Sequence, residues 1–174
     1  MIKIIVSTNR PNAISEKIAE FYQQILSDLG AESEIITLGE LPDDFLFSAL
    51  YDKRGKNKAF NLIQEKVNAG KKFVFIVPEY NGSFPGILKS FIDGMAYPNS
   101  FKNKKCALVG ISSGFSGGGL ALSHLTDIFQ YLGMHVLANL PKLAYIEKNL
   151  SDNQLTNELY VELLNIQAKM LIDF

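Results

Sequence analysis

One stretch of the chain reads Phe73-Val74-Phe75-Ile76-Val77-Pro78-Glu79-Tyr80-Asn81-Gly82-Ser83-Phe84-Pro85-Gly86. Its first five residues are apolar, which is typical of a strand buried on both faces of a sheet. The remainder is a polar loop with a proline near each end, and a helical pattern follows from Ile87 to Met95. A plain strand–helix connector usually has about 2–6 residues, whereas loops at the carboxyl ends of parallel strands are where open α/β sheets bind ligands. We therefore predict that residues 78–86 form a binding loop.

Apolar runs and helical stripes alternate along the rest of the chain. We predict strands at Ile2–Val6, Ser33–Leu38, Phe73–Val77, Ala107–Ile111 and Met134–Leu137. Helices are predicted over residues 14–29, 60–69, 87–95 and 120–132, and at the carboxyl end from a stripe of Leu155, Leu159, Leu163, Ile166 and Met170. Residues 42–55 have an irregular pattern with the exposed-looking aromatics Phe45, Phe47 and Tyr51, which could roof a ligand or touch a partner but could equally pack onto their own sheet. This alternation predicts one α/β domain over residues 1–174, with a parallel sheet covered on both faces.

The loop after the first strand has the composition of an anion site. Residues 7–15 read Ser-Thr-Asn-Arg-Pro-Asn-Ala-Ile-Ser and open a helix, whose N-terminal N–H groups and dipole favour an anion. Thr8 and Ser15 can donate hydroxyl hydrogen bonds, and Arg10 can add a charge-assisted one. The loop lacks the glycines and the terminal Gly-Lys-[Ser/Thr] of a nucleotide P-loop. The alternative is a capped loop with a solvated arginine.

The loop after the fourth strand is rich in serine and glycine. Residues 112–119 read Ser-Ser-Gly-Phe-Ser-Gly-Gly-Gly. Three consecutive glycines indicate close backbone approach or unusual φ angles, and their N–H groups could cradle the edge of a ligand. A merely flexible turn is an equal alternative when the loop is taken alone. Because the carboxyl ends of parallel strands meet at one edge of a sheet, we expect all three loops to lie together.

These loops resemble those of one known family. The run from Pro78 to Lys89 closely resembles the flavin-ring loop of the NADPH-dependent FMN reductase family, Pro-Glu-Tyr-Asn-Gly-Ser-x-Pro-Gly-x-Leu-Lys, and is intact here. The first loop resembles the family's phosphate loop, Gly-[Ser/Thr]-x-Arg-x-x-Ser-x-[Asn/Thr/Ser], at Thr8, Arg10 and Ser15. It departs at Ser7, where the family has glycine, and at Ala13, where the loss of the family's serine removes one phosphate donor. The third loop is similar to the family's serine- and glycine-rich flavin loop.

The resemblance implies a flavodoxin-like sheet of order 2-1-3-4-5. It implies an FMN-dependent oxidoreductase in which hydride passes from NADPH or NADH through FMN to a small-molecule acceptor, a flavin, a quinone or an azo dye. No side chain is expected to be catalytic, since the cofactor carries the chemistry; Asn81 is the favoured ring contact, and Glu79 is either a general base or a group that braces the loop. The implied cofactor-binding residues are Thr8, Arg10, Asn12, Ser15, Pro78, Glu79, Tyr80, Asn81, Gly82, Ser83, Ser113, Gly114, Ser116 and Gly117.

Composition excludes several other functions. The formal net charge of −1 gives no general attraction for nucleic acid or for an anionic membrane, so neither partner is expected. No apolar run reaches the roughly 18 residues of a membrane span, and the amino terminus has the pattern of a strand rather than a signal peptide. The single cysteine, Cys106, favours a buried position, no metal site and a cytoplasmic protein. His124 and His135 are expected to be ordinary residues, and lysines 71, 72, 102, 104 and 105 to be solvated.

Two other functions and an assembly stay open at this point. A flavodoxin-like electron carrier is the first alternative, although such carriers are usually strongly acidic around the flavin. A family member that has lost FMN is the second, because of Ser7 and Ala13. The working form is expected to be a homodimer or a dimer of dimers, since the helix at residues 87–95 carries more apolar surface than one buried stripe needs, extended by Ala96, Tyr97 and Pro98. Burial of that helix under the carboxyl-terminal helix would remove this argument.

Overall fold

The chain forms a parallel sheet in strand order β2-β1-β3-β4-β5, with β6 also paired to β4. The computed structural model describes residues 1–97 and 100–174. The strands of this sheet are β1 Ile2–Val6, β2 Ser33–Thr37, β3 Lys72–Pro78, β4 Lys105–Ile111, β5 His135–Val136 and β6 Lys142–Leu143. A separate antiparallel hairpin consists of β7 Leu150–Ser151 and β8 Gln154–Leu155. The predicted flavodoxin-like order is confirmed.

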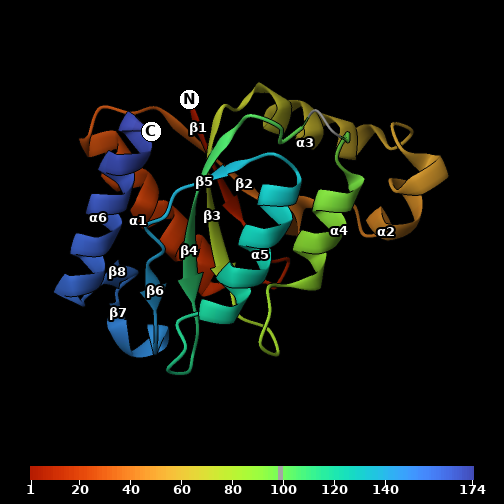
Figure 1. Ribbon diagram of the computed structural model, residues 1–174. Helices are drawn as coiled ribbons and strands as arrows, with labels where there is room; N and C mark the ends of the chain where they lie inside the picture. Colours follow the sequence, from red (N-terminus) through yellow and green to blue (C-terminus); the bar gives the residue numbers. More distant parts are fainter. Residues whose placement is uncertain (98–99) are drawn as a thin grey trace.

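Helices cover both faces of the sheet. They are α1 Ile14–Asp28, α2 Phe45–Ser48, α3 Lys58–Ala69, α4 Gly86–Gly94, α5 Gly119–Tyr131 and α6 Glu158–Asp173, with short 3₁₀ turns η1 Leu38–Glu40, η2 Tyr51–Lys53 and η3 Ile146–Asn149. Figure 1 shows α1 and α6 on one side of the strands and α4 and α5 on the other. Side chains of β3 alternate between the two layers, with Phe73 and Phe75 facing α3–α5 and Val74 and Ile76 facing α1 and α6. This burial on both faces explains the unbroken apolar runs.

Two local predictions near the second strand are wrong. Leu38 begins η1 instead of ending β2, because the Thr37 hydroxyl accepts a hydrogen bond from the Gly39 N–H at 3.2 Å and turns the chain. Phe45 is buried rather than exposed, with its ring 4.7 Å from that of Phe60. Phe47 is exposed as expected.

The apolar side of α4 is already covered within the single chain. Leu88, Phe91, Ile92 and Met95 are buried, and Phe91 packs edge-on against Phe60 of α3. Most of the apolar surface predicted for this helix is therefore buried, but Tyr97, named with this surface, is 64% exposed. It is not α6 that covers α4, because α6 lies on the opposite face of the sheet (Figure 1). Pro98, named with this surface, lies outside the described residues.

The carboxyl-terminal helix buries a different face from the predicted one. The buried residues of α6 are Leu164, Gln167, Ala168 and Leu171. Ile166 and Met170 of the predicted stripe are each 41% exposed, and Leu159 is 58% exposed. Leu155 belongs to β8 instead of the helix. The buried face has apolar residues of its own at Leu164, Ala168 and Leu171, and it also includes a glutamine, which an apolar pattern cannot reveal.

That glutamine closes a gap in the edge of the sheet. β5 pairs with the start of β4 and β6 with its end, so the middle of β4 has no neighbouring strand there. The fully buried Gln167 donates through Nε2 to the carbonyl oxygens of Leu108 at 2.9 Å and Asn139 at 2.8 Å, and its Oε1 accepts from the Tyr22 hydroxyl at 3.1 Å. Burial raises the pKa of Tyr22, so the phenol stays a donor. The Gln167 side chain thus supplies a hydrogen bond to β4 that a neighbouring strand would otherwise supply.

Several lysines expected to be solvated instead bind helix ends. Lys104 Nζ donates to the carbonyl oxygens of Val67 and Asn68, both at 3.0 Å, at the carboxyl end of α3. Partial burial lowers the pKa of Lys104. Lys72 and Lys105 donate to the carbonyl oxygens of Ile172 and Phe174, at the end of α6. Cations at these positions satisfy the last carbonyls of a helix. In the described residues no helix is long and apolar enough to cross a membrane.

A buried ion pair joins the first two strands. Lys3 is 2% exposed and its ammonium contacts Glu34 Oε2, while Lys66 Nζ lies 3.2 Å from Glu34 Oε1. The hydrogen bond from Lys3 is the main reason why the pKa of Glu34 lies below its ordinary value. Because the folded pKa is lowered, the stabilisation is present above the ordinary carboxyl pKa and is lost as pH falls through the lowered value.

We expect a Glu34→Gln variant to lose about 2 kcal/mol of its free energy of unfolding at pH 7. Breaking a fully buried pair costs about 3–5 kcal/mol, and the partial exposure of Glu34 reduces this. Urea denaturation at pH 7 and pH 3 measures it, and the difference between variant and parent should shrink at pH 3. Lys3→Met with Glu34→Gln should recover most of the loss, since no buried charge is then left unpaired. Equal stabilities of Glu34→Gln and parent at pH 7 would contradict the argument.

Candidate functional site

A cavity of about 390 Å³ opens at the carboxyl edge of the sheet. The loops after β1, β3 and β4 meet there, joined by η3, which follows β6; these loops lie at the lower end of the molecule in Figure 1. The predicted convergence of the three loops is thus present in the structure. The lining residues are Arg10, Asn12, Ala13, Ile14, Ser15, Pro78, Glu79, Tyr80, Ile111, Ser112, Ser113, Ile146 and Glu147.

The first loop presents a helix end to the cavity. Ala13 is the N-cap of α1, and among the described residues no side chain caps this helix. Arg10 is exposed, and Ser15, in the first turn of α1, is buried. An uncapped helix N-terminus beside a guanidinium is suited to an anionic group. Asn12 reaches φ 54°, a conformation that asparagine tolerates better than most residues, and so turns the loop toward the helix.

Thr8 ties the first loop to the second. It is 2% exposed, its Oγ1 lies 2.8 Å from the Tyr80 hydroxyl, and it accepts from the Arg10 N–H at 3.2 Å. The threonine therefore holds the loop that carries Arg10 against the loop that carries Tyr80. Ser7, which stands in place of the family's glycine, is fully buried and fits without a positive φ.

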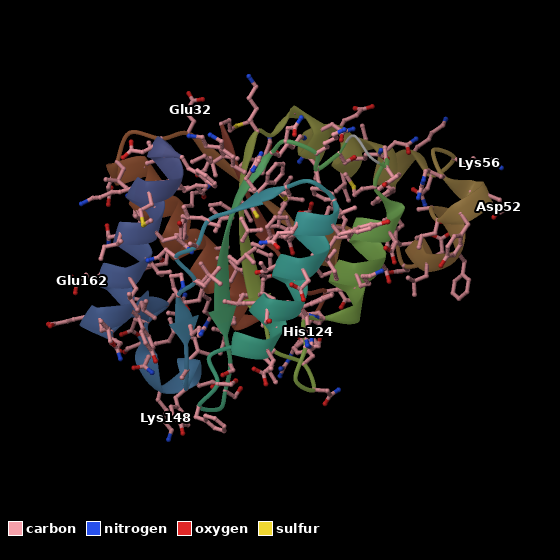
Figure 2. The ribbon with its side chains drawn as sticks, viewed as in Figure 1. Glu32, Asp52, Lys56, His124, Lys148 and Glu162 are labelled. Atoms are coloured by element: carbon pink, nitrogen blue, oxygen red, sulfur yellow. The ribbon has the colours of Figure 1, made fainter. Side chains whose placement is uncertain are left out.

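The second loop contains a tight turn. Tyr80 and Ser83 exchange backbone hydrogen bonds of 2.7 and 3.1 Å, and the residues between them, Asn81 and Gly82, have φ angles of 51° and 75°. Asn-Gly with two positive φ angles is typical of a type I′ hairpin turn. The exposed Asn81 is therefore a turn residue outside the cavity lining. His124 is not an isolated helix residue, since its Nδ1 lies 3.0 Å from the Ser83 hydroxyl, beside this loop in Figure 2.

The glycines of the third loop pack against their own chain. The N–H groups of Gly117 and Gly118 donate to the hydroxyls of Ser112 at 2.8 Å and Ser116 at 3.3 Å, and that of Gly119 donates to the Ser116 carbonyl at 3.1 Å. A Cβ on Gly117 would lie 2.7 Å from the backbone of Lys142 in β6. Close approach was predicted correctly, but the neighbour is the chain itself. These three N–H groups are engaged within the loop, and contact of the loop with a ligand stays a prediction.

Two carboxylates face the cavity from this side. Glu79 Oε2 accepts from the Ser116 hydroxyl, and Glu147 Oε1 accepts from the Ser113 hydroxyl, each at 2.5 Å. Glu79 thus joins the second and third loops, which agrees with the bracing role considered for it. Glu147 comes from η3, which sequence patterns did not suggest.

The family model for NADPH-dependent FMN reductases matches residues 1–144. The chain belongs to this FMN reductase family. A 2-hydroxy-1,4-benzoquinone reductase from Burkholderia sp is 28% identical over 145 residues, covering 82% of this chain and 76% of that protein. A quinone reductase from Pseudomonas putida is 28% identical over 123 residues, which cover 67% of this chain and only 62% of that protein.

Solved structures agree with the fold. The flavoenzyme NAD(P)H:(acceptor) oxidoreductase FerB from Paracoccus denitrificans superposes with a TM-score of 0.77 at 24% identity, covering 99% of this chain and 94% of that chain. Membership of the FMN reductase family confirms the predicted family, its reaction class and its cofactors, FMN with NADPH or NADH.

The lining of the cavity fits FMN by its donors and acceptors. An uncapped helix N-terminus and Arg10 suit a phosphate, while the oxygens of Glu79 and Glu147 suit groups that donate hydrogen bonds, such as ribityl hydroxyls. The volume of about 390 Å³ lies within the usual range of ligand sites.

Half of the predicted site residues of this FMN reductase family member line the cavity, and half do not. Those that line it are Arg10, Asn12, Ser15, Pro78, Glu79, Tyr80 and Ser113. Those behind or beside it are Thr8, Asn81, Gly82, Ser83, Gly114, Ser116 and Gly117. Their contact with a cofactor stays a prediction. Ile146 and Glu147 were missed, and the one sequence signal for them was their position shortly after the apolar residues of 137–144.

Proposed function

We propose that this protein reduces a small-molecule acceptor of quinone, flavin or azo type with electrons from NADPH or NADH, using FMN held in the cavity at the carboxyl edge of the sheet. The observation that carries the proposal is the convergence of three loops and the uncapped start of α1 on that one cavity. Family membership and the quinone reductases among the relatives support the acceptor class.

Residues in different parts of the cavity have different roles in cofactor binding. The first turn of α1 and Arg10 hold the phosphate, and the stiff backbone at Pro78, Glu79 and Tyr80 supports the flat ring. Thr8 keeps these two loops in register through its contact with Tyr80. When bound, FMN supplies the capacity to take up a hydride from a nicotinamide and pass it to the acceptor. The protein orients the ring, and no side chain needs to act as a nucleophile.

We expect Arg10→Ala to weaken FMN binding about ten- to a hundredfold, since a hydrogen bond to a charged group is worth about 1.5–3 kcal/mol. Quenching of FMN fluorescence by added protein measures the dissociation constant. Arg54→Ala is the matched control, because Arg54 is exposed and bonds the Asp93 carbonyl outside the cavity. Ala13→Ser should tighten binding modestly by restoring a donor. An unaltered protein that binds no FMN at micromolar concentration would overturn the proposed function.

Steady-state kinetics test the order of the reaction. If nicotinamide and acceptor use the same open side of the cavity in turn, NADPH and a quinone should give parallel double-reciprocal lines. Intersecting lines would mean that both substrates bind together.

A homodimer remains part of the proposal, now on different grounds. The exposed aromatics Phe47 and Tyr51, at 84% and 80% exposure, lie on the segment that projects beyond α4. Large exposed apolar side chains favour an interface. A constant mass of about 19 kDa in light scattering over a dilution series would contradict the homodimer.

We also propose that residues 1–174 form one domain. We propose a cytoplasmic location as well, which the single buried Cys106 supports.

A further inference from the structure

The cavity that we propose as the FMN site carries an excess of negative charge. Its lining includes two carboxylates, Glu79 and Glu147, and one guanidinium, Arg10. Lys148, next in sequence to Glu147, extends away from the lower edge of the molecule with its ammonium 5.2 Å from the centre of the Tyr145 ring (Figure 2). The side chains of the lining therefore have a formal charge of −1.

Both carboxylates accept a hydrogen bond from a serine hydroxyl of the third loop, Glu79 in a part-buried contact and Glu147 in an exposed one. Ser116 donates to Glu79, and Ser113 donates to Glu147, each at 2.5 Å. A carboxylate held by a short hydrogen bond keeps its charge in a defined place relative to the cavity. Among the described residues the Glu147 carboxylate makes no further hydrogen bond or ion pair, whereas Glu79 also joins two loops.

The glycine N–H groups of the third loop do not offset this charge. The N–H groups of Gly117, Gly118 and Gly119 are bonded within the third loop. They therefore do not supply the positive end of a dipole to a group in the cavity. The positive groups left at the cavity are Arg10 and the uncapped start of α1, both on the first loop, whereas Glu147 lies on η3.

We propose that Glu147 lowers the midpoint potential of FMN bound in this cavity and so makes the protein a stronger reductant. The inference rests on the proposed function. A hydride brings two electrons and one proton from the nicotinamide to FMN, so the site gains one negative charge unless a second proton enters. A fixed carboxylate close by disfavours that added charge by Coulomb repulsion. Reduced FMN is then held less tightly relative to oxidised FMN.

Glu147 comes from the part of the chain that follows the match to the family model. The family model ends at residue 144, before Glu147. The residue reaches the cavity only because β6 pairs with the end of β4 and delivers η3 to the same edge of the sheet.

The test is the Glu147→Gln variant, which removes the charge but keeps an oxygen that accepts from Ser113. Midpoint potentials are measured by stepwise reduction with dithionite beside a reference dye, on parent and variant loaded with FMN. We expect reduced FMN to be bound about tenfold more tightly relative to oxidised FMN in the variant. For a two-electron couple, this corresponds to a rise of about 30 mV.

Two control variants distinguish the effect of losing the Glu147 charge from other effects of a substitution. Glu147→Asp keeps the charge and should leave the potential near that of the parent. Glu162→Gln removes an equal charge on the outer side of α6, far from the cavity (Figure 2), and should also leave it unchanged. A parent that binds FMN together with a Glu147→Gln potential within a few millivolts of the parent would overturn this inference alone. A folded parent that binds no FMN would overturn the proposed function, and this inference with it.

Discussion

A Gly110→Ala variant is expected to lose about 3 kcal/mol of its free energy of unfolding and to bind FMN at least about tenfold more weakly. Gly110 lies in β4, and a Cβ there would stand 2.3 Å from the Gly117 carbonyl oxygen and 3.1 Å from Leu122 Cδ1. The nearer atom is backbone, so relief requires the whole third loop to move. That loop supplies Ser112 and Ser113 to the cavity.

Gly114→Ala in the same loop is the matched control. An added Cβ at Gly114 meets no atom within 4 Å, and its φ is not positive. This variant should stay within about 0.5 kcal/mol of the parent, as surface substitutions usually do. Thermal unfolding and FMN titration of both variants measure the contrast. If Gly110→Ala behaved like Gly114→Ala, the close packing of loop on strand would not be needed for the site.

The central part of the fold could be predicted because strands that are buried on both faces have unbroken apolar sequences. β1, β3 and β4 are apolar runs, and each leads into a polar loop, so the edge where the loops meet followed from parallel pairing. The helices on either side showed clear stripes, as in α1 and α3. The strand order came from family resemblance, since periodicity cannot order strands.

The remainder depends on contacts between distant parts of the chain. β6 has only two residues, Lys142–Leu143, too few for an alternating or apolar pattern, and yet it positions Glu147 at the cavity. The glycine run predicted a close approach, but only the structure shows that Gly110 and Lys142 are what it approaches. A local sequence pattern indicates that a close contact is needed, but it does not show which residue makes that contact.

The exposed stripe on α6 has the same cause. Leu159, Ile166 and Met170 have helical spacing and suggested a buried face, but the helix turns Gln167 and Ala168 inward instead. One contact that favours this face is the hydrogen bond to the Leu108 carbonyl in β4, 59 residues away in sequence. The buried face thus meets a hydrogen-bonding requirement of the sheet and also packs its own apolar residues, Leu164 and Leu171.

Gln167→Leu should therefore be among the most destabilising substitutions in the chain. Leucine fills a similar volume, but it leaves the carbonyl oxygens of Leu108 and Asn139 and the Tyr22 hydroxyl without their partner. Each buried polar group left unsatisfied costs about 1–3 kcal/mol, and because the three share one site we expect about 3 kcal/mol in total. For a chain of this length that lowers the melting temperature by about 6–12 °C.

Tyr22→Phe separates the contributions within this network. It removes only the hydroxyl, so Gln167 keeps both carbonyl partners, and the expected loss is about 1 kcal/mol. The double variant should lose less free energy of unfolding than the two single variants lose together, because the tyrosine hydroxyl has already lost its acceptor in Gln167→Leu. Urea denaturation of the parent, both single variants and the double variant gives the coupling. A Gln167→Leu protein as stable as the parent would show that the carbonyls of Leu108 and Asn139 do not depend on the glutamine for their hydrogen bonds.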